Sequence, residues 1–198
     1  MARIYLLRHG KTQGPAALNG ITDVAVDADV QQAIASRLLD RSFTRVISSP
    51  LRRCADLAQR IQHARPDVIL DYDANLQEMN FGLFDGQSFS NLEQEWPLLD
   101  AFWKDPAHNT LPQAESLASA YQRVTQAWQQ WLPQMEGDTL VICHAGTIRL
   151  ILAHILGVDW RNPDWYSRLS IPYQSISELT LYRDEPYFVS VNSIGNVL

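Results

Sequence analysis

Hydrophobic positions along the 198-residue chain form short apolar runs separated by longer amphipathic segments. Four runs are rich in Val, Ile and Leu, and they predict buried β-strands at residues 4–7, 44–49, 68–72 and 138–143. Elsewhere apolar residues recur at intervals of three and four, which is typical of amphipathic helices. Such helices are expected at 27–39, at 51–62, from about 115 to before Pro133, and at 147–157.

The alternation of strands and helices predicts an α/β fold, a three-layer α/β/α sandwich with a mainly parallel sheet. The length fits one domain, 1–198, with a well-filled core. An aromatic-rich segment at about 80–114 breaks the alternation and is expected to be a helical insertion. Two runs of period two flank residues 183–186 and predict a hairpin or two edge strands.

Composition and charge narrow the function classes. Hydrophobic residues make up 46% and charged residues 19%, which indicates a folded globular protein. A net charge of -6 argues against a broad surface for nucleic acid or an anionic membrane, so any anion must be bound by a local cluster of cations. No apolar run reaches 18 residues and charge appears early, so we expect a cytoplasmic protein. Cys54 and Cys143 lack CxxC spacing and are expected to be buried free thiols.

Polar residues follow three of the predicted strands. The runs YLLRHGKT and LVICHAGT place His9 and His144 where strands end, and the carboxyl ends of parallel strands meet at one edge of a sheet. The run SSPLRRC places Arg52 and Arg53 in a first helical turn, where the helix dipole disfavours cations. A bound phosphate would stabilise them through guanidinium and helix N–H donors. An alternative is that the histidines are packing residues of the core and that the arginines lie on a solvent-exposed face. The occurrence of histidines and arginines at three strand ends favours an anion-binding site.

Five motifs in order carry a family resemblance: LLRHGKT, ISSPLRRCADLA, LQEMNFGLFDGQS, LPQAES and VICHAGTIR. On these motifs the chain resembles the histidine phosphatase superfamily, also called phosphoglycerate mutase-like, over nearly its whole length. The resemblance implies the phosphoglycerate mutase-like fold and a phosphohistidine intermediate.

The resemblance also implies a role for individual residues. His9 matches the nucleophile, Glu78 the proton donor and His144 the second active-site histidine. Arg8 and Arg53 match the phosphate ligands, and the neighbouring Arg52 is expected to face solvent.

The chemistry is consistent with these roles. An imidazole attacks phosphorus through a neutral nitrogen, and arginines with a protonated His144 would stabilise the charge on the transferring group. The scheme needs no metal and no cofactor. The remaining histidines are scattered in the sequence and are expected to have surface or packing roles: His63, His108 and His154.

Some positions depart from the family pattern. Pro15 stands where the family often has a phosphate-binding asparagine, so Thr12, Asn19 or Thr22 must substitute or one contact is lost. Three further replacements are small or apolar and are expected to have little effect on the site: Leu57, Ala114 and Ala145.

The segment between the matched glutamate and the second histidine is shorter than in the mutases of the family. This difference favours hydrolysis over transfer of the phosphoryl group back to the substrate. The aromatic residues of this segment predict either a wall over the phosphate pocket or a core of the insertion itself: Phe81, Phe84, Phe89, Trp96, Phe102 and Trp103. Within the superfamily the chain most resembles the α-ribazole phosphatases of cobalamin biosynthesis.

The substrate is expected to be a small-molecule phosphomonoester, and the protein a monomer or homodimer. Two alternatives stay open beside the α-ribazole activity. One is a broad sugar-phosphate phosphatase or a phosphoglycerate mutase-like enzyme, and the other is an inactive phospho-ligand-binding module.

Overall fold

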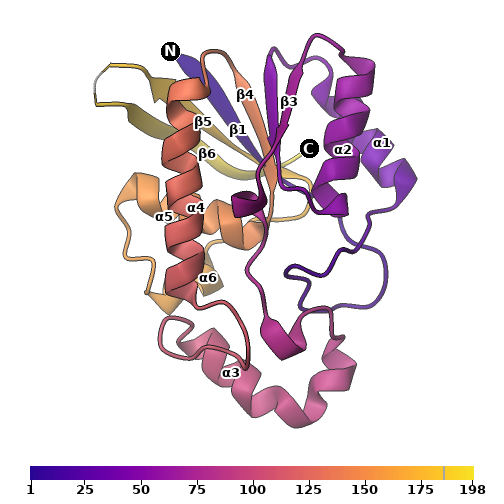
Figure 1. The fold of residues 1–198 in the computed structure, drawn as a ribbon, viewed down its shortest axis with the longest axis vertical. Helices are drawn as coiled ribbons and strands as arrows, with labels where there is room; N and C mark the ends of the chain where they lie inside the picture. Colours follow the sequence, from indigo (N-terminus) through magenta and orange to yellow (C-terminus); the bar gives the residue numbers. More distant parts are fainter. Residues whose placement is uncertain (185) are drawn as a thin grey trace.

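The computed structural model describes residues 1–184 and 186–198. At its centre lies a six-stranded sheet with the order β3-β2-β4-β1-β5-β6 (Figure 1). The first four strands in this order are parallel, whereas β5 and β6 each run antiparallel to the preceding strand. The strands are β1 (Ala2–Arg8), β2 (Arg45–Ser48), β3 (Ile69–Tyr72), β4 (Thr139–Cys143), β5 (Ser175–Tyr182) and β6 (Phe188–Val197).

Helices cover both faces of the sheet, which confirms the predicted α/β class. In Figure 1, α1 and α2 lie on one side of the sheet and α4 and α5 on the other. The short α6 was not predicted, because six residues give too little periodicity. The helices are α1 (Ala28–Leu38), α2 (Arg52–Ala64), α3 (Trp96–Lys104), α4 (Leu117–Trp131), α5 (Ala145–Leu156) and α6 (Pro163–Arg168).

The central strands are apolar on both faces, and this explains their unbroken hydrophobic runs. Successive strand side chains point to opposite sides, so neighbours in sequence enter different cores. One member of each pair packs with α4 and α5 and the other with α1 and α2: Leu6 and Leu7, Ile47 and Val46, Val141 and Ile142.

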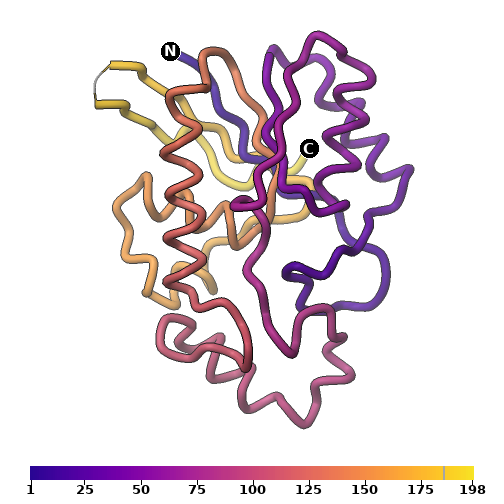
Figure 2. The backbone as a smooth tube through the Cα atoms, in the orientation of Figure 1, coloured from indigo at the N-terminus to yellow at the C-terminus, as the bar shows by residue number. Residues whose placement is uncertain are grey.

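The aromatic-rich segment 80–114 forms two 3-10 helices, Gly82–Phe84 and Phe89–Glu95, followed by α3. In Figure 2 it is the loop at the bottom, beyond the carboxyl ends of the parallel strands. Gly82 has φ +61°, and a Cβ there would collide with the carbonyl oxygen of Pro112. Glycine therefore allows the two ends of the segment to lie together.

The two alternating runs near the C-terminus form the predicted hairpin, β5 and β6. Glu185, in the expected turn, lies outside the described residues. None of the helices formed by residues 1–184 and 186–198 is long and apolar enough to cross a membrane.

We expect Leu6→Ala to lower the free energy of unfolding by about 3 kcal/mol, because it removes a side chain fully buried in the central strand and leaves a cavity. Urea denaturation measures the change. The matched control is Leu83→Ala, at a leucine that is 55% exposed, which should change the free energy of unfolding by less than about 0.5 kcal/mol. Equal losses for the two variants would contradict the placement of β1 in the core.

Candidate active site

The pairing of β1 with β4 brings the two strand-end histidines together. Arg8 lies opposite Cys143 in the parallel register, and the backbone N–H of His9 donates to the Cys143 carbonyl at 3.2 Å. The rings of His9 and His144 then meet edge to face, with centroids 5.1 Å apart. Both side chains are buried. The sheet register alone therefore brings together the two histidines singled out in the sequence.

The surroundings of His9 fix its tautomer. Nδ1–H donates to the Gly10 carbonyl oxygen at 2.7 Å, which leaves Nε2 without a proton. Burial, reinforced by the charge of Arg53, lowers the pKa of His9 to about 3. His9 is therefore a neutral imidazole at neutral pH, with the free lone pair that attack on phosphorus requires.

His144 forms the hydrogen bonds of a neutral imidazole in this structure, whereas the protonated form is expected while a phosphoryl group is transferred. Its Nδ1 accepts a hydrogen bond from Nε of Arg53 at 3.1 Å, so the ring proton sits on Nε2, 2.9 Å from Ser49 Oγ. Burial and then the charge of Arg53 hold the pKa of His144 well below its ordinary value.

Arg53 is fully buried and holds the loop that faces the histidines. Besides the bond to His144, Nη1 donates to the Thr22 carbonyl at 2.9 Å, and Nη2 donates to the carbonyls of Asn19, at 3.2 Å, and Gly20. Four of its five N–H donors thus have protein acceptors, and none of the acceptors is a carboxylate. The charge of the Arg53 guanidinium is therefore stabilised by carbonyl and imidazole dipoles, and among the described residues no carboxylate pairs with it.

Arg52 faces solvent, with 59% of its side chain exposed. Its backbone N–H donates to a carboxylate oxygen of Asp23 at 2.7 Å, at the start of α2. Asp23 therefore supplies the anion that this helix N-terminus favours. The presence of Arg52 in the first turn of α2 is therefore explained without a bound phosphate.

Arg8 is half-buried beside His9. Nη1 donates to the Ile171 carbonyl at 2.6 Å, and the guanidinium carbon lies 3.6 Å from the centroid of the Tyr173 ring. Its buried Nε has no hydrogen-bond partner among the described residues. A buried donor without an acceptor is costly, so a ligand oxygen at this position would stabilise Arg8.

Glu78 is half-buried next to the start of α5. Its Oε2 accepts from the backbone N–H of Gly146 at 3.0 Å, and Oε1 accepts from the N–H of Met79 at 3.1 Å. A Cβ at position 146 would collide with the Glu78 carboxylate. The glycine two residues after His144 is therefore what lets the Glu78 carboxylate approach the start of α5.

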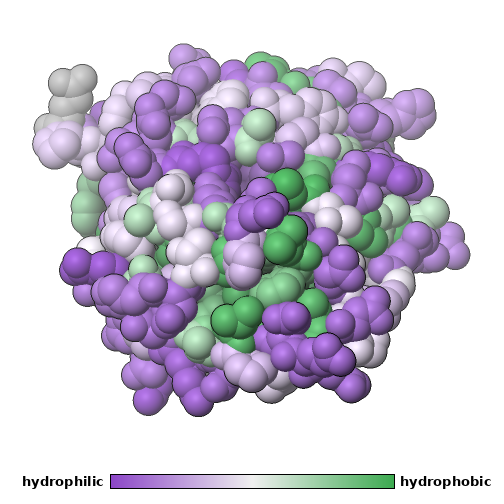
Figure 3. Space-filling view, turned by 60° about the horizontal axis from the view of Figure 1, so that its bottom comes forward, coloured by the Kyte–Doolittle hydropathy of each residue, from purple (hydrophilic) through white to green (hydrophobic). Residues whose placement is uncertain are grey.

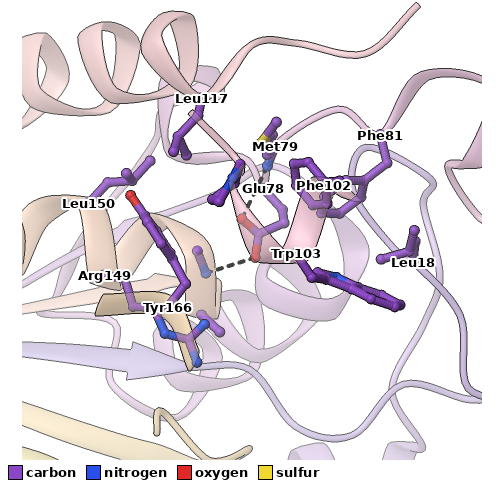
Figure 4. A pocket seen from close by; sticks show the side chains of 13 residues that line it. Leu18, Glu78, Met79, Phe81, Phe102, Trp103, Leu117, Arg149, Leu150 and Tyr166 are labelled. Atoms are coloured by element: carbon purple, nitrogen blue, oxygen red, sulfur yellow. Dashed lines mark hydrogen bonds between the residues drawn. The ribbon is translucent and has the colours of Figure 1, made fainter. Parts of the chain in front are cut away.

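A cavity of about 190 Å³ opens beside Glu78 (Figure 4). Figure 3 turns the end of the molecule that carries α3 toward the viewer, and apolar residues gather across its centre. The aromatic side chains that line the cavity come from the insertion and from α6: Phe81, Phe102, Trp103 and Tyr166. The cavity is largely apolar, with Glu78 and Arg149 as its charged lining residues.

The aromatic residues of the insertion divide between the two predicted roles. Phe81, Phe102 and Trp103 line the cavity, whereas Phe84 is buried in the core. Phe89 and Trp96 pack against Trp103, with ring centroids 6.0 and 5.5 Å from it, respectively. Three of these six aromatic residues therefore form part of the cavity wall, two pack behind Trp103, and Phe84 belongs to the core.

The family model for the histidine phosphatase superfamily (branch 1) matches residues 4–194. The chain belongs to this superfamily. A probable phosphoglycerate mutase of Erwinia tasmaniensis is 31% identical over 210 residues, which cover 100% of this chain and 94% of that protein.

Two solved structures share the fold. A mycobacterial glucosyl-3-phosphoglycerate phosphatase superposes with a TM-score of 0.83 at 19% identity, over 98% of this chain and 99% of that one. The α-ribazole phosphatase of Shigella flexneri gives 0.79 at 22% identity, over 99% and 98%. These two structures show the shared fold, and the family match together with the Erwinia tasmaniensis relative shows a phosphatase or mutase-like enzyme of the histidine phosphatase type.

Pro15, at the position of the usual family asparagine, is exposed. Of the three candidate substitutes, the Thr22 hydroxyl donates to Asp85 at 2.5 Å, and the Asn19 amide lies 3.4 Å from the Thr12 hydroxyl. Thr22 therefore has no hydroxyl hydrogen free for a phosphate.

Asp85 does more than bind one hydroxyl. It also accepts from the backbone N–H groups of Ile21 and Thr22, at 3.0 and 2.8 Å, and from that of Phe81 at 2.9 Å. The carboxylate thus ties the loop held by Arg53 to the beginning of the insertion.

Two further residues of this histidine phosphatase were missed in the sequence. Tyr173 reaches Arg8 from the loop before β5, and its ring centroid lies 5.7 Å from that of His9. No pattern in the sequence marks it, because the contact depends on loop conformation. Arg149 lines the cavity from α5, and its place in the motif VICHAGTIR, five residues after His144, was an available signal.

We expect the free energy of unfolding to fall as the pH is lowered from about 6.5 toward 3. In this window unfolded histidine binds a proton and folded His9 does not, so acid favours the unfolded chain, by up to about 1.4 kcal/mol per pH unit for this one group. His9→Asn should make the dependence shallower in urea titrations at several pH values. The control His63→Asn, at an exposed histidine, should not. An unchanged pH dependence in His9→Asn would contradict a neutral buried His9.

Proposed function

We propose that this histidine phosphatase hydrolyses a phosphomonoester through a phosphohistidine formed on His9. One observation carries the proposal: Arg8 and Arg53 converge on a neutral imidazole, and within residues 1–184 and 186–198 their hydrogen-bond acceptors are carbonyls and a second imidazole, with the Tyr173 ring beside Arg8. In a chain of net charge -6, such a local excess of positive charge favours a dianionic ligand.

In the first step Nε2 of His9 attacks phosphorus, and the ester P–O bond opposite to it breaks. Arg8 and Arg53 stabilise the charge on the equatorial oxygens. Glu78, in its protonated form, donates a proton to the departing oxygen. In the second step water attacks the phosphohistidine, Glu78 accepts the proton, the N–P bond breaks and inorganic phosphate leaves.

The cavity beside Glu78 would hold the leaving group, because the proton donor must reach the ester oxygen. Its aromatic walls support a leaving group with a flat apolar part. We therefore propose α-ribazole 5′-phosphate as a substrate, with a place in cobalamin biosynthesis. The fold shared with the Shigella flexneri α-ribazole phosphatase is compatible with this proposal.

A second candidate is a phosphorylated hydroxy acid. Arg149, a cation in the same cavity, favours it, because a carboxylate would pair with the guanidinium. The name of the Erwinia tasmaniensis relative, a probable phosphoglycerate mutase, points to the same class.

The first measurement is release of inorganic phosphate by the purified protein, with EDTA present, from α-ribazole 5′-phosphate, 3-phosphoglycerate, AMP and p-nitrophenyl phosphate. We expect turnover of at least one substrate. A strong preference for α-ribazole 5′-phosphate supports the cobalamin role, and a preference for 3-phosphoglycerate supports the hydroxy-acid candidate. No turnover of any of the four contradicts the proposal and favours a phospho-ligand-binding module.

We expect His9→Ala to lower kcat by at least about 1,000-fold, because the attacking nitrogen is lost. Rapid quench into alkaline SDS with a ³²P-labelled substrate should trap a base-stable, acid-labile label on the wild-type protein and none on the variant. Circular dichroism should show that the variant remains folded, and His63→Ala, at an exposed histidine, serves as the matched control. A His9→Ala protein that keeps most of its activity would refute the mechanism.

A further inference from the structure

The motif LPQAES, residues 111–116, ends at the start of α4. The Ser116 hydroxyl caps this helix by accepting from the backbone N–H of Ser119 at 3.1 Å. Glu115 lies just before the cap, and a single arginine of α4 binds both of its carboxylate oxygens. Nε of Arg123 donates to Oε1 at 2.9 Å, and Nη2 donates to Oε2 at 2.8 Å. Two parallel bonds are the geometry that guanidinium and carboxylate favour.

Arg123 also binds the chain that leads to Glu78. Its Nη1 donates to the carbonyl oxygens of Asn75 and Gln77, at 2.7 and 3.1 Å. The hydroxyl of Thr147, in α5, donates to the same Gln77 carbonyl at 3.1 Å. The backbone immediately before the proposed proton donor is therefore bound from two helices, α4 and α5.

Glu115 binds the chain that follows Glu78. Its backbone N–H donates to the Asn80 carbonyl at 2.9 Å, and its Oε2 lies 3.4 Å from the Asn80 N–H. The carboxylate of Glu78 itself accepts from the backbone N–H groups of Gly146 and Met79. The ion pair of Glu115 and Arg123 thus reaches Glu78 through the backbone on both of its sides.

This ion pair is better suited to fixing a conformation than to adding stability. The side chains of Arg123 and Glu115 are only 21% and 17% exposed, and the desolvation of two charges offsets much of their attraction. A proton donor must lie within hydrogen-bond reach of the leaving oxygen. A displacement of about 1 Å can slow such a reaction about 100-fold. Rigid support of residues 75–80 therefore matters for the rate.

We propose that Glu115 and Arg123 are positioning residues for Glu78, because their ion pair fixes residues 75–80 so that the carboxyl group reaches the leaving oxygen. The proposal rests on the proposed phosphatase activity, with Glu78 as the proton donor. It gives the glutamate of LPQAES a role in proton donation. Loss of the pair should therefore slow a reaction more when the leaving group has a greater need for a proton.

Two phosphate esters of similar size test the proposal. p-Nitrophenolate is stable as an anion and leaves without a proton, whereas the alkoxide of benzyl phosphate needs one. In Arg123→Met we expect kcat/KM to fall by about 100-fold for benzyl phosphate and by less than about fivefold for p-nitrophenyl phosphate. Glu78→Gln should show the same selectivity. Arg123→Lys, which keeps a cationic donor, should lose less activity towards benzyl phosphate than Arg123→Met.

The quantity compared is the ratio of the two kcat/KM values. The fraction of folded protein cancels in this ratio, so a variant that is only destabilised leaves the ratio unchanged. The matched control is Arg168→Met, which removes an ion pair on α6 whose arginine and aspartate side chains are 79% and 58% exposed. It should keep the wild-type ratio.

The outcomes separate this proposal from the proposed function. If the wild type hydrolyses neither ester, the phosphatase function fails and the positioning role fails with it. If Glu78→Gln lowers both values equally, Glu78 is not the proton donor and the positioning role fails. If Glu78→Gln is selective but Arg123→Met keeps the wild-type ratio, the positioning role is overturned and the phosphatase function stands. If Arg123→Met does not fold, the ratios of Arg123→Lys and Glu115→Gln decide in the same way.

Discussion

The structure depends on the buried guanidinium of Arg53, which forms no ion pair with a carboxylate in the part of the chain that the structure describes. Arg53 links α2, the loop of residues 19–22 and His144 through donors that end on neutral acceptors. Burying a charge in this way is costly unless hydrogen bonds and a further partner compensate it. Burial, reinforced by the same charge, lowers the pKa of both histidines. Arg53 therefore shapes the loop, contributes to the protonation state of the imidazoles and favours an anion at the site.

The other parts of the site follow from backbone geometry. The parallel register of β1 and β4 places His9 next to His144. The helix that starts after His144 offers the N–H of Gly146 to Glu78, and no side chain at that position blocks the carboxylate. The two histidines are thus positioned where buried strands end, whereas Glu78 lies in the loop after the 3-10 helix Ala74–Leu76.

Much of this arrangement could be predicted from the sequence because it depends on short-range patterns. Apolar runs marked the strands, and the histidines and arginines beside them marked one edge of the sheet. The protonation of His144 could not be predicted, since it depends on burial and on the orientation of Arg53. The contact of Tyr173 with Arg8 was hidden for a similar reason: the loop before β5 is positioned by tertiary contacts, such as the bond from Arg8 to Ile171, that no local pattern reports.

The carboxylate of Asp85 has a consequence for how a change in one loop reaches another part of the molecule. It joins Ile21 and Thr22, in the loop that Arg53 holds, to Phe81 at the beginning of the segment 80–114. Backbone hydrogen bonds of Leu18 with Gly86 and Gln87 add to this connection. A displacement of the loop would therefore be transmitted to Phe81, which lines the cavity.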